Sequence, residues 1–149
     1  MNEKIDAFSI NKDNRYQFDG FIDKTYKLIE ELQLLDSELW ARFVVQFKTE
    51  ADNDMHWRGE YWGKMMRGGC FVYSYTKNEA LYQILNTTVL DMLNSADNLG
   101  RISTYGIEKE FDGWDLWCRK YVLLGMQYFL EICRDQELSD EILASMCAQ

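Results

Sequence analysis

Two short clusters of aromatic and charged residues contain the side chains best suited to chemistry. They are 56–64, with the sequence HWRGEYWGK, and 108–120, with the sequence EKEFDGWDLWCRK. Tryptophan and tyrosine rings stack on the apolar C–H face of a sugar, while carboxylates and guanidinium groups hydrogen-bond its paired hydroxyls. Both clusters lie at predicted helix starts, where free backbone amides also face a ligand. This composition is typical of a sugar-binding site.

A purely structural interpretation of the same clusters stays open. Tryptophans near helix starts commonly belong to the core, and Arg58 with Glu60 could form an ordinary solvated ion pair. Asp112 and Asp115 lie three residues apart, which allows the separation of about 5 to 9.5 Å between glycosidase carboxylates. Acids are also the ordinary choice at a helix start, because they complement the helix dipole. The pattern therefore assigns no catalytic residue.

Metal and cofactor chemistry finds little support among the remaining residues. His56 is the only histidine, and no two of the four cysteines have the short spacing of a zinc site. The sequence contains no glycine-rich phosphate loop, dinucleotide fingerprint or nucleophile elbow. We expect no metal and no cofactor in this chain, and we interpret the cysteines as reduced thiols of a cytoplasmic protein.

Composition limits the class of protein and its partners. The chain has 149 residues, of which 47% are hydrophobic, so it can form the core of a single domain. It has no proline, which favours helices over sheets. A net charge of −9 disfavours binding to nucleic acid or to an anionic membrane surface. The first residues lack the basic and apolar regions of a secretory signal, which also agrees with a cytoplasmic location.

Apolar residues recur with the period of a helix along most of the chain, which predicts an all-α protein built as an array of αα-hairpins. A capping box at Thr76–Glu79 and an N-cap at Ser139 mark two helix starts. Between helices, 101–113 is predicted to be a loop with one short strand at Arg101–Tyr105. The predicted helices span 21–35, 37–47, about 57–75, about 79–98, 114–134 and 139 onward.

The helix predicted over 114–134 is apolar nearly all round. Such a helix must be covered on nearly every side, which predicts a central helix wrapped by the others. The last predicted helix stops in the middle of its apolar pattern. We therefore expect these 149 residues to be part of a longer protein.

Three stretches, in order, resemble the β-L-arabinofuranosidase-like glycoside hydrolases, family 127 and its relatives. They are 57–66 (WRGEYWGKMM), 97–105 (DNLGRISTY) and 114–121 (WDLWCRKY). In that family a G-K-W helix precedes a D-G-Y-L-x-T-Y loop and a helix that opens with H-E-L-Y. The resemblance implies that residues 1–149 are a single helical domain, the N-terminal portion of a larger (α/α)6 toroid. It also implies a sugar pocket, for which we expect the substrate-binding residues Trp57, Arg58, Tyr105, Trp114 and Asp115.

This sequence departs from the family pattern at two points. Trp114 stands at the position of the family's histidine and Asp115 at that of its glutamate, so one hydrogen bond to the sugar is lost. The family's zinc-held cysteine nucleophile and its partner glutamates belong to motifs further downstream. The resemblance thus implies that this chain alone is inactive and that any zinc belongs to the full-length parent.

Two other interpretations compete with a glycoside hydrolase fragment. One is a different (α/α)6 sugar enzyme, such as an epimerase or an unsaturated-uronide hydrolase. The other is a self-contained helical interaction module without catalytic activity. A partial toroid leaves apolar faces uncovered, especially on the third and fifth helices, and we therefore expect a homodimer or a higher oligomer.

Overall fold

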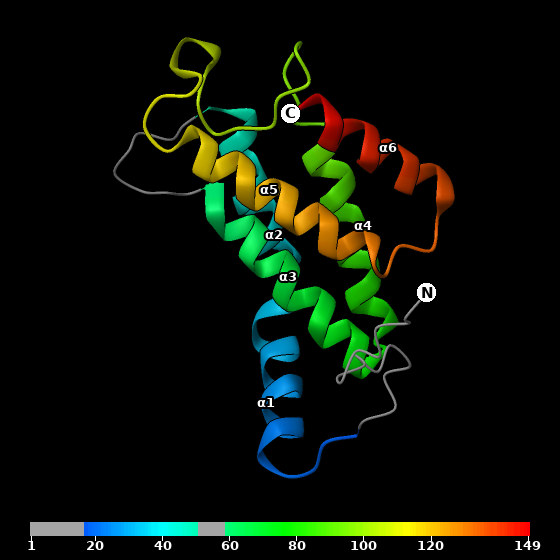
Figure 1. Ribbon diagram of the computed structural model, residues 1–149. Helices are drawn as coiled ribbons and strands as arrows, with labels where there is room; N and C mark the ends of the chain where they lie inside the picture. Colours follow the sequence, from blue (N-terminus) through cyan, green and yellow to red (C-terminus); the bar gives the residue numbers. More distant parts are fainter. Residues whose placement is uncertain (1–16, 51–58) are drawn as a thin grey trace, which may run out of the picture.

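The computed structural model describes residues 17–50 and 59–149, and all regular structure within these ranges is helical. The predicted all-α class is therefore confirmed. A π-helical turn, Glu30–Leu34, extends the first helix, and a short 3₁₀ turn, Ile107–Lys109, interrupts the long loop. No helix in the described ranges has the length and hydropathy of a membrane span. The α-helices are α1 (Phe21–Ile29), α2 (Ser37–Lys48), α3 (Gly59–Thr76), α4 (Glu79–Leu93), α5 (Asp115–Leu130) and α6 (Gln136–Ala148) (Figure 1).

Two predicted helix caps are wrong. The side chain of Asn78, not that of Thr76, caps α4, because its Oδ1 accepts a hydrogen bond from the Ala80 amide at 3.0 Å. The Thr76 hydroxyl instead donates to Glu30 at 2.5 Å. The N-cap of α6 is Asp135, which accepts hydrogen bonds from two following amides, and Ser139 lies inside the helix.

Two further expectations about the polypeptide backbone are corrected. The segment 101–105 is buried but forms no strand, because no second extended segment pairs with it in the described residues. The fifth helix ends at Leu130 rather than near Arg134, and the chain turns there before α6. The intervening 131–135 segment brings Arg134 to α4, where it pairs with Glu79 at 2.9 Å.

Helices α3 and α5 run side by side in the same direction (Figure 1). Gly59 lies against Cys118, and Gly63 lies against the backbone of Tyr121, so residue numbers rise together along both helices. At Gly63 an added Cβ would lie only 2.0 Å from the Tyr121 carbonyl oxygen. Glycine is therefore required for this close approach. Helix α4 carries the chain back to the end where α3 began, and α5 starts there.

A common core joins α2 through α6. Trp62 on α3 is fully buried, and its indole Nε1 donates to the Thr88 hydroxyl of α4 at 3.0 Å. Trp40 on α2 is similarly buried and donates to the Leu34 carbonyl oxygen at 2.9 Å. Each indole therefore satisfies its only donor while burying its rings. Other core side chains include Val44, Phe47, Met66, Leu81, Leu85, Val89, Met92, Val122, Met126, Phe129, Leu138 and Ile142.

Helix α5 is not enclosed on every side, which corrects the expectation of a fully wrapped central helix. Leu116 is 58% exposed, Leu123 and Leu124 are half-buried, and Gln127 is exposed. These residues line one side of a groove of about 810 Å³ whose other side is α6. Helix α3 covers the opposite side of α5, so α5 is a partly covered helix at the edge of the fold.

Candidate functional site

The first turns of α3 and α5 meet at one end of the molecule, because the two helices are parallel and in register there. Glu60 on α3 is buried, and both of its carboxylate oxygens accept hydrogen bonds. The Trp117 indole Nε1 donates to Oε2 at 2.6 Å, and the Lys64 ammonium donates to Oε1 at 3.0 Å. The hydrogen bond to Glu60 raises the pKa of Lys64, so this side chain stays cationic at neutral pH.

Three aromatic rings follow one another along the exposed side of this contact. The Trp114 and Trp117 ring centroids are 5.8 Å apart, and those of Trp117 and Tyr121 are 5.3 Å apart, both in edge-to-face geometry. The Lys120 ammonium lies 3.4 Å from the Trp117 ring centroid and 4.0 Å from that of Tyr121. These residues form what we call the α3–α5 cluster: Glu60, Lys64, Trp114, Trp117, Lys120 and Tyr121.

The α3–α5 cluster is accessible to solvent. Trp114 is 38% exposed and Trp117 is 37% exposed, whereas Trp40 and Trp62 are buried in the core. Half-exposed indoles have apolar surface to offer to a ligand, and Lys120 supplies hydrogen-bond donors beside it. The hydrogen bond from the Trp117 indole to Glu60 fixes the orientation of the Trp117 ring. The Lys120 ammonium covers one face of the Trp117 ring, so a polyol or sugar would contact the remaining exposed indole surface and the Lys120 donors.

A buried carboxylate holds the long loop against the start of α5. Asp115 is fully buried, and its oxygens accept hydrogen bonds from the Ser103 hydroxyl at 2.6 Å and the Phe111 amide at 3.0 Å. The Arg119 guanidinium lies 3.6 Å from the same carboxylate. Ser103 also accepts a hydrogen bond from the Tyr105 amide at 3.1 Å. Asp115 thus fixes the position of the loop that borders the α3–α5 cluster.

A second carboxylate folds the beginning of that loop. Asp97 accepts hydrogen bonds from the Leu99 amide at 2.9 Å, the Arg101 amide at 3.0 Å and the Arg101 Nε at 2.7 Å. Burial acts to raise the pKa of Asp97, but the hydrogen bonds from Arg101 and Leu99 outweigh it and the pKa is lowered. Arg101 is itself buried at 4% exposure, so the ion pair is partly shielded from water.

The five sequence-predicted site residues lie in different environments. Trp57 and Arg58 lie outside the described residues. Tyr105 is 1% exposed and Asp115 is fully buried, so neither side chain is open to a ligand in this conformation. Only Trp114 is both described and accessible. Of the acid pair considered above, Asp112 is exposed, while Asp115 is occupied by its protein partners.

Sequence reasoning missed most of the α3–α5 cluster. Trp114, Trp117 and Tyr121 are spaced i, i+3 and i+7, which places them on one side of a helix and could have identified the aromatic group. The contact between Glu60 and Trp117 joins residues 57 positions apart, and no local pattern indicates it.

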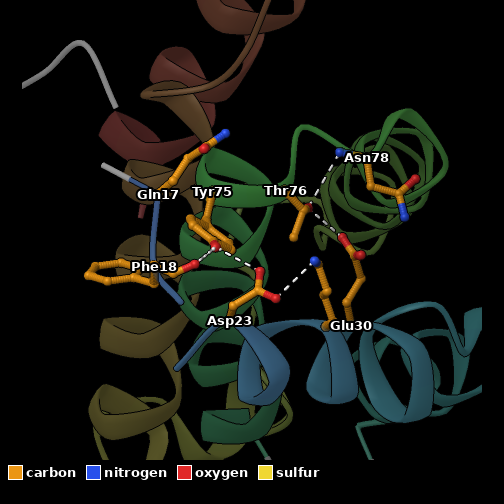
Figure 2. A pocket seen from close by; sticks show the side chains of 8 residues that line it. Gln17, Phe18, Asp23, Glu30, Tyr75, Thr76 and Asn78 are labelled. Atoms are coloured by element: carbon orange, nitrogen blue, oxygen red, sulfur yellow. Dashed lines mark hydrogen bonds and ion pairs between the residues drawn. The ribbon is translucent and has the colours of Figure 1, made fainter. Parts of the chain in front are cut away.

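A polar cavity of about 570 Å³ lies at the other end of α3, beside α1. Figure 2 shows Asp23 directed toward Tyr75 and Glu30 directed toward Thr76, whereas Gln17 and the Phe18 ring are directed away from these pairs. The Tyr75 hydroxyl donates to Asp23 at 2.8 Å, and the Lys27 ammonium donates to the same carboxylate at 2.9 Å. The hydrogen bond from Lys27 lowers the pKa of Asp23, while Asp23 raises the pKa of Tyr75. These contacts dock α1 onto the end of α3.

Within residues 17–50 and 59–149, no group of three or more histidine, cysteine, aspartate or glutamate side chains has a metal-binding arrangement. Comparisons with protein-family models, curated proteins and solved structures found no match to this chain.

Proposed function

We propose that this chain is the N-terminal part of a β-L-arabinofuranosidase-like glycoside hydrolase and forms one wall of its sugar-binding pocket. The observation that carries the proposal is the α3–α5 cluster. In it, partly exposed indoles lie beside two lysines, where the first turns of two parallel helices are in contact. In this proposal the chain contains no catalytic centre, and the zinc-held nucleophile belongs to the full-length parent.

The path of the chain supports a partial (α/α)6 toroid. In such a ring the inner helices are parallel to one another, and each outer helix returns the chain to the end where the next inner helix begins. Helices α3 and α5 have the relation of two inner helices, and α4 has that of the returning outer helix. The α3–α5 cluster then lies at the mouth of the ring, where the resemblance places the sugar pocket.

Two other functions share parts of this geometry. An unsaturated-uronide hydrolase or a sugar epimerase would use the same toroid, and Lys120 would favour a sugar that carries a carboxylate. A helical interaction module is favoured by the exposed apolar side chains of α1. A cytoplasmic location is supported by the four cysteines, none of which forms a disulfide.

Titration with simple methyl glycosides tests the proposal and separates the first two alternatives. We expect methyl β-L-arabinofuranoside to shift the indole N–H signals of Trp114 and Trp117 in two-dimensional NMR spectra and to leave those of Trp40 and Trp62 in place. Stronger binding of a methyl uronide would favour the uronide enzyme instead. Absence of saturable binding by either sugar would contradict a sugar site.

A pair of variants assigns the binding to the cluster. Because loss of an aromatic contact is worth about 1 kcal/mol, Trp117→Ala is expected to weaken binding by about fivefold to tenfold. Phe71→Ala is the matched control, since Phe71 is exposed and belongs to the same array but lies outside the cluster. Circular dichroism spectra verify that both variants are folded. Equal affinity of the two variants for the sugar would show that Trp117 is not part of the binding site.

A further inference from the structure

The polar cavity between α1 and the end of α3 has room for a small molecule. Its volume of about 570 Å³ lies within the range of about 300 to 1,000 Å³ that is usual for ligand pockets. Among the described residues that line it, Phe18 alone has an apolar side chain, so the cavity suits a ligand that forms hydrogen bonds. We call it the α1–α3 cavity, and its polar walls include Asp23, Lys27, Glu30, Tyr75, Thr76 and Asn78.

One of the two carboxylates in the α1–α3 cavity is already neutralised. Asp23 accepts a hydrogen bond from the Tyr75 hydroxyl on Oδ1 and one from the Lys27 ammonium on Oδ2. The contact between Lys27 and Asp23 is also an ion pair, at 2.9 Å. Asp23 therefore has no uncompensated charge for a ligand.

The other carboxylate, Glu30, has no cationic partner among the described residues. Its side chain is 9% exposed, and its hydrogen bond there comes from the neutral Thr76 hydroxyl, which donates to Oε1 at 2.5 Å. Lys77, which follows α3, lies over the Tyr73 ring instead. A hydroxyl does not neutralise a carboxylate, and buried charges in proteins are normally paired with an opposite charge. A cationic ligand would therefore gain most at Glu30 Oε2.

Glu30 is held in position without a ligand. The Thr76 hydroxyl that donates to Glu30 also accepts a hydrogen bond from the Asn78 amide at 3.4 Å (Figure 2). Glu30 is the first residue of the π-helical turn, and such turns are rare and frequently lie at functional sites. A carboxylate that is already oriented loses little further freedom when it binds a ligand.

We propose that the α1–α3 cavity binds a small hydroxylated primary amine. The ammonium group of this ligand pairs with Glu30 Oε2, and a neighbouring hydroxyl accepts a hydrogen bond from Lys27, which has two N–H donors left. A single positive charge matches the two carboxylates and one ammonium that line the described part of the cavity. An organic cation is favoured over a metal ion, because the described residues contain no metal-binding group of side chains.

This inference does not depend on the proposed sugar function, because the α1–α3 cavity and the α3–α5 cluster lie at opposite ends of α3. Glucosamine and glucose form a matched pair of probes for it. Glucosamine carries an ammonium group beside its hydroxyls at about pH 6, and glucose has a neutral hydroxyl at the same position. Two-dimensional NMR spectra locate the binding, since the backbone amide signals of Thr76 and Asn78 report on the cavity and the indole signal of Trp117 reports on the α3–α5 cluster.

We expect glucosamine to shift the Thr76 and Asn78 signals in a saturable manner when the full 149-residue chain is titrated at low salt. Glucose is expected to bind there about tenfold more weakly or less, because a charge-assisted hydrogen bond is worth at least that factor. The Trp117→Ala variant should bind glucosamine in the cavity with unchanged affinity.

A charge-removing variant assigns the interaction to Glu30. Glu30→Gln keeps the shape of the side chain and an acceptor for the Thr76 hydroxyl, and it is expected to weaken glucosamine binding by about tenfold or more. Glu31→Gln is the matched control, since Glu31 is the adjacent carboxylate, is exposed and does not line the cavity. It should bind glucosamine as the unmodified chain does. Circular dichroism spectra verify that both variants are folded.

Four results would overturn the proposal. They are glucosamine shifts at Thr76 and Asn78 that do not saturate, glucose binding there as tightly as glucosamine, unchanged glucosamine affinity in folded Glu30→Gln, and glucosamine shifts confined to the Trp117 indole. If Glu30→Gln does not fold, the comparison of glucosamine with glucose on the unmodified chain still decides whether the cavity selects a cation. Failure of the α3–α5 cluster to bind any sugar would leave these cavity signals unaffected.

Discussion

Substitution of Gly63 by alanine tests the close contact between α3 and α5. The added Cβ would lie 2.0 Å from the Tyr121 carbonyl oxygen and 2.6 Å from its carbonyl carbon. Favourable contact between such atoms needs about 3.5 Å, so the two helices would have to separate by more than about 1 Å. The opposing atoms belong to the backbone and cannot rotate away as a side chain would.

The expected loss of stability follows from two opposing effects. Replacing glycine by alanine inside a helix favours folding by about 1 kcal/mol. Overpacking a tight contact costs about 1 to 3 kcal/mol, and a clash with backbone belongs at the upper end. We therefore expect Gly63→Ala to lower the free energy of unfolding by about 2 kcal/mol. For a chain of this length that corresponds to a thermal midpoint about 4 to 8 °C lower.

Thermal unfolding followed by circular dichroism measures this change, with Gly68→Ala as the matched control. Gly68 belongs to the same helix, but a Cβ there meets nothing within 4 Å. Gly68→Ala should gain only the higher helix propensity of alanine, which is expected to raise the thermal midpoint by about 2 to 4 °C. If Gly63→Ala is as stable as Gly68→Ala, or as the unmodified chain, the close parallel packing of α3 and α5 is wrong.

Two further predictions concern a carboxylate and the thiols. Because the pKa of Asp97 is lowered in the folded chain, its contribution to stability is complete above about pH 4 and is lost as the pH falls through the lower folded value. Asp97→Asn should therefore lower the thermal midpoint at pH 7 and flatten its decline in acid, as measured by melts over a pH series. Burial raises the pKa of the Cys70 thiol, whereas Cys147 is exposed. A thiol reagent at neutral pH should therefore label Cys147 first and Cys70 only when the chain unfolds. Mass spectrometry of the labelled peptides measures this order.

Each of these predictions has an internal control. Asp91→Asn changes an exposed carboxylate whose ion pair with Lys48 spans 4.0 Å, and it should leave the acid profile nearly unchanged. Identical profiles for the two aspartate variants would show that the Asp97 hydrogen bonds do not contribute as described. Labelling of Cys70 as fast as Cys147 in the folded chain would contradict the burial of α3 against its neighbours.

The helices themselves were predictable because apolar periodicity reports local structure directly. Helices α2 and α3 end within one or two residues of their predicted ends. The caps were less predictable, because Thr76 and Asn78 are both good cap residues within three positions. The choice depends on the contact of Thr76 with Glu30, which lies 46 residues earlier in the chain.

The burial of the fifth helix was predicted less well than its existence. An apolar surface indicates that a helix is stabilised when other segments pack on it, but it does not show whether the chain provides such a segment. Leu116 and Leu124 therefore look like core residues in the sequence and lie beside an open groove in the structure. Similarly, Tyr105 and Asp115 are residue types found in sugar sites, but Tyr105 in the loop and Asp115 at the start of α5 are both buried.

The α3–α5 cluster and the stability of the fold depend on the same contact. Glu60 reaches Trp117 only because Gly63 and Gly125 allow the two helix axes to approach so closely. Separation of the helices by Gly63→Ala should therefore also lengthen the hydrogen bond between Glu60 and the Trp117 indole, and the indole N–H signal of Trp117 should shift while that of Trp40 does not. Gly63, which has no functional group, would then determine the geometry of the candidate sugar site. This explains why the sequence identified Trp114 as a site residue but not the arrangement of the cluster around it.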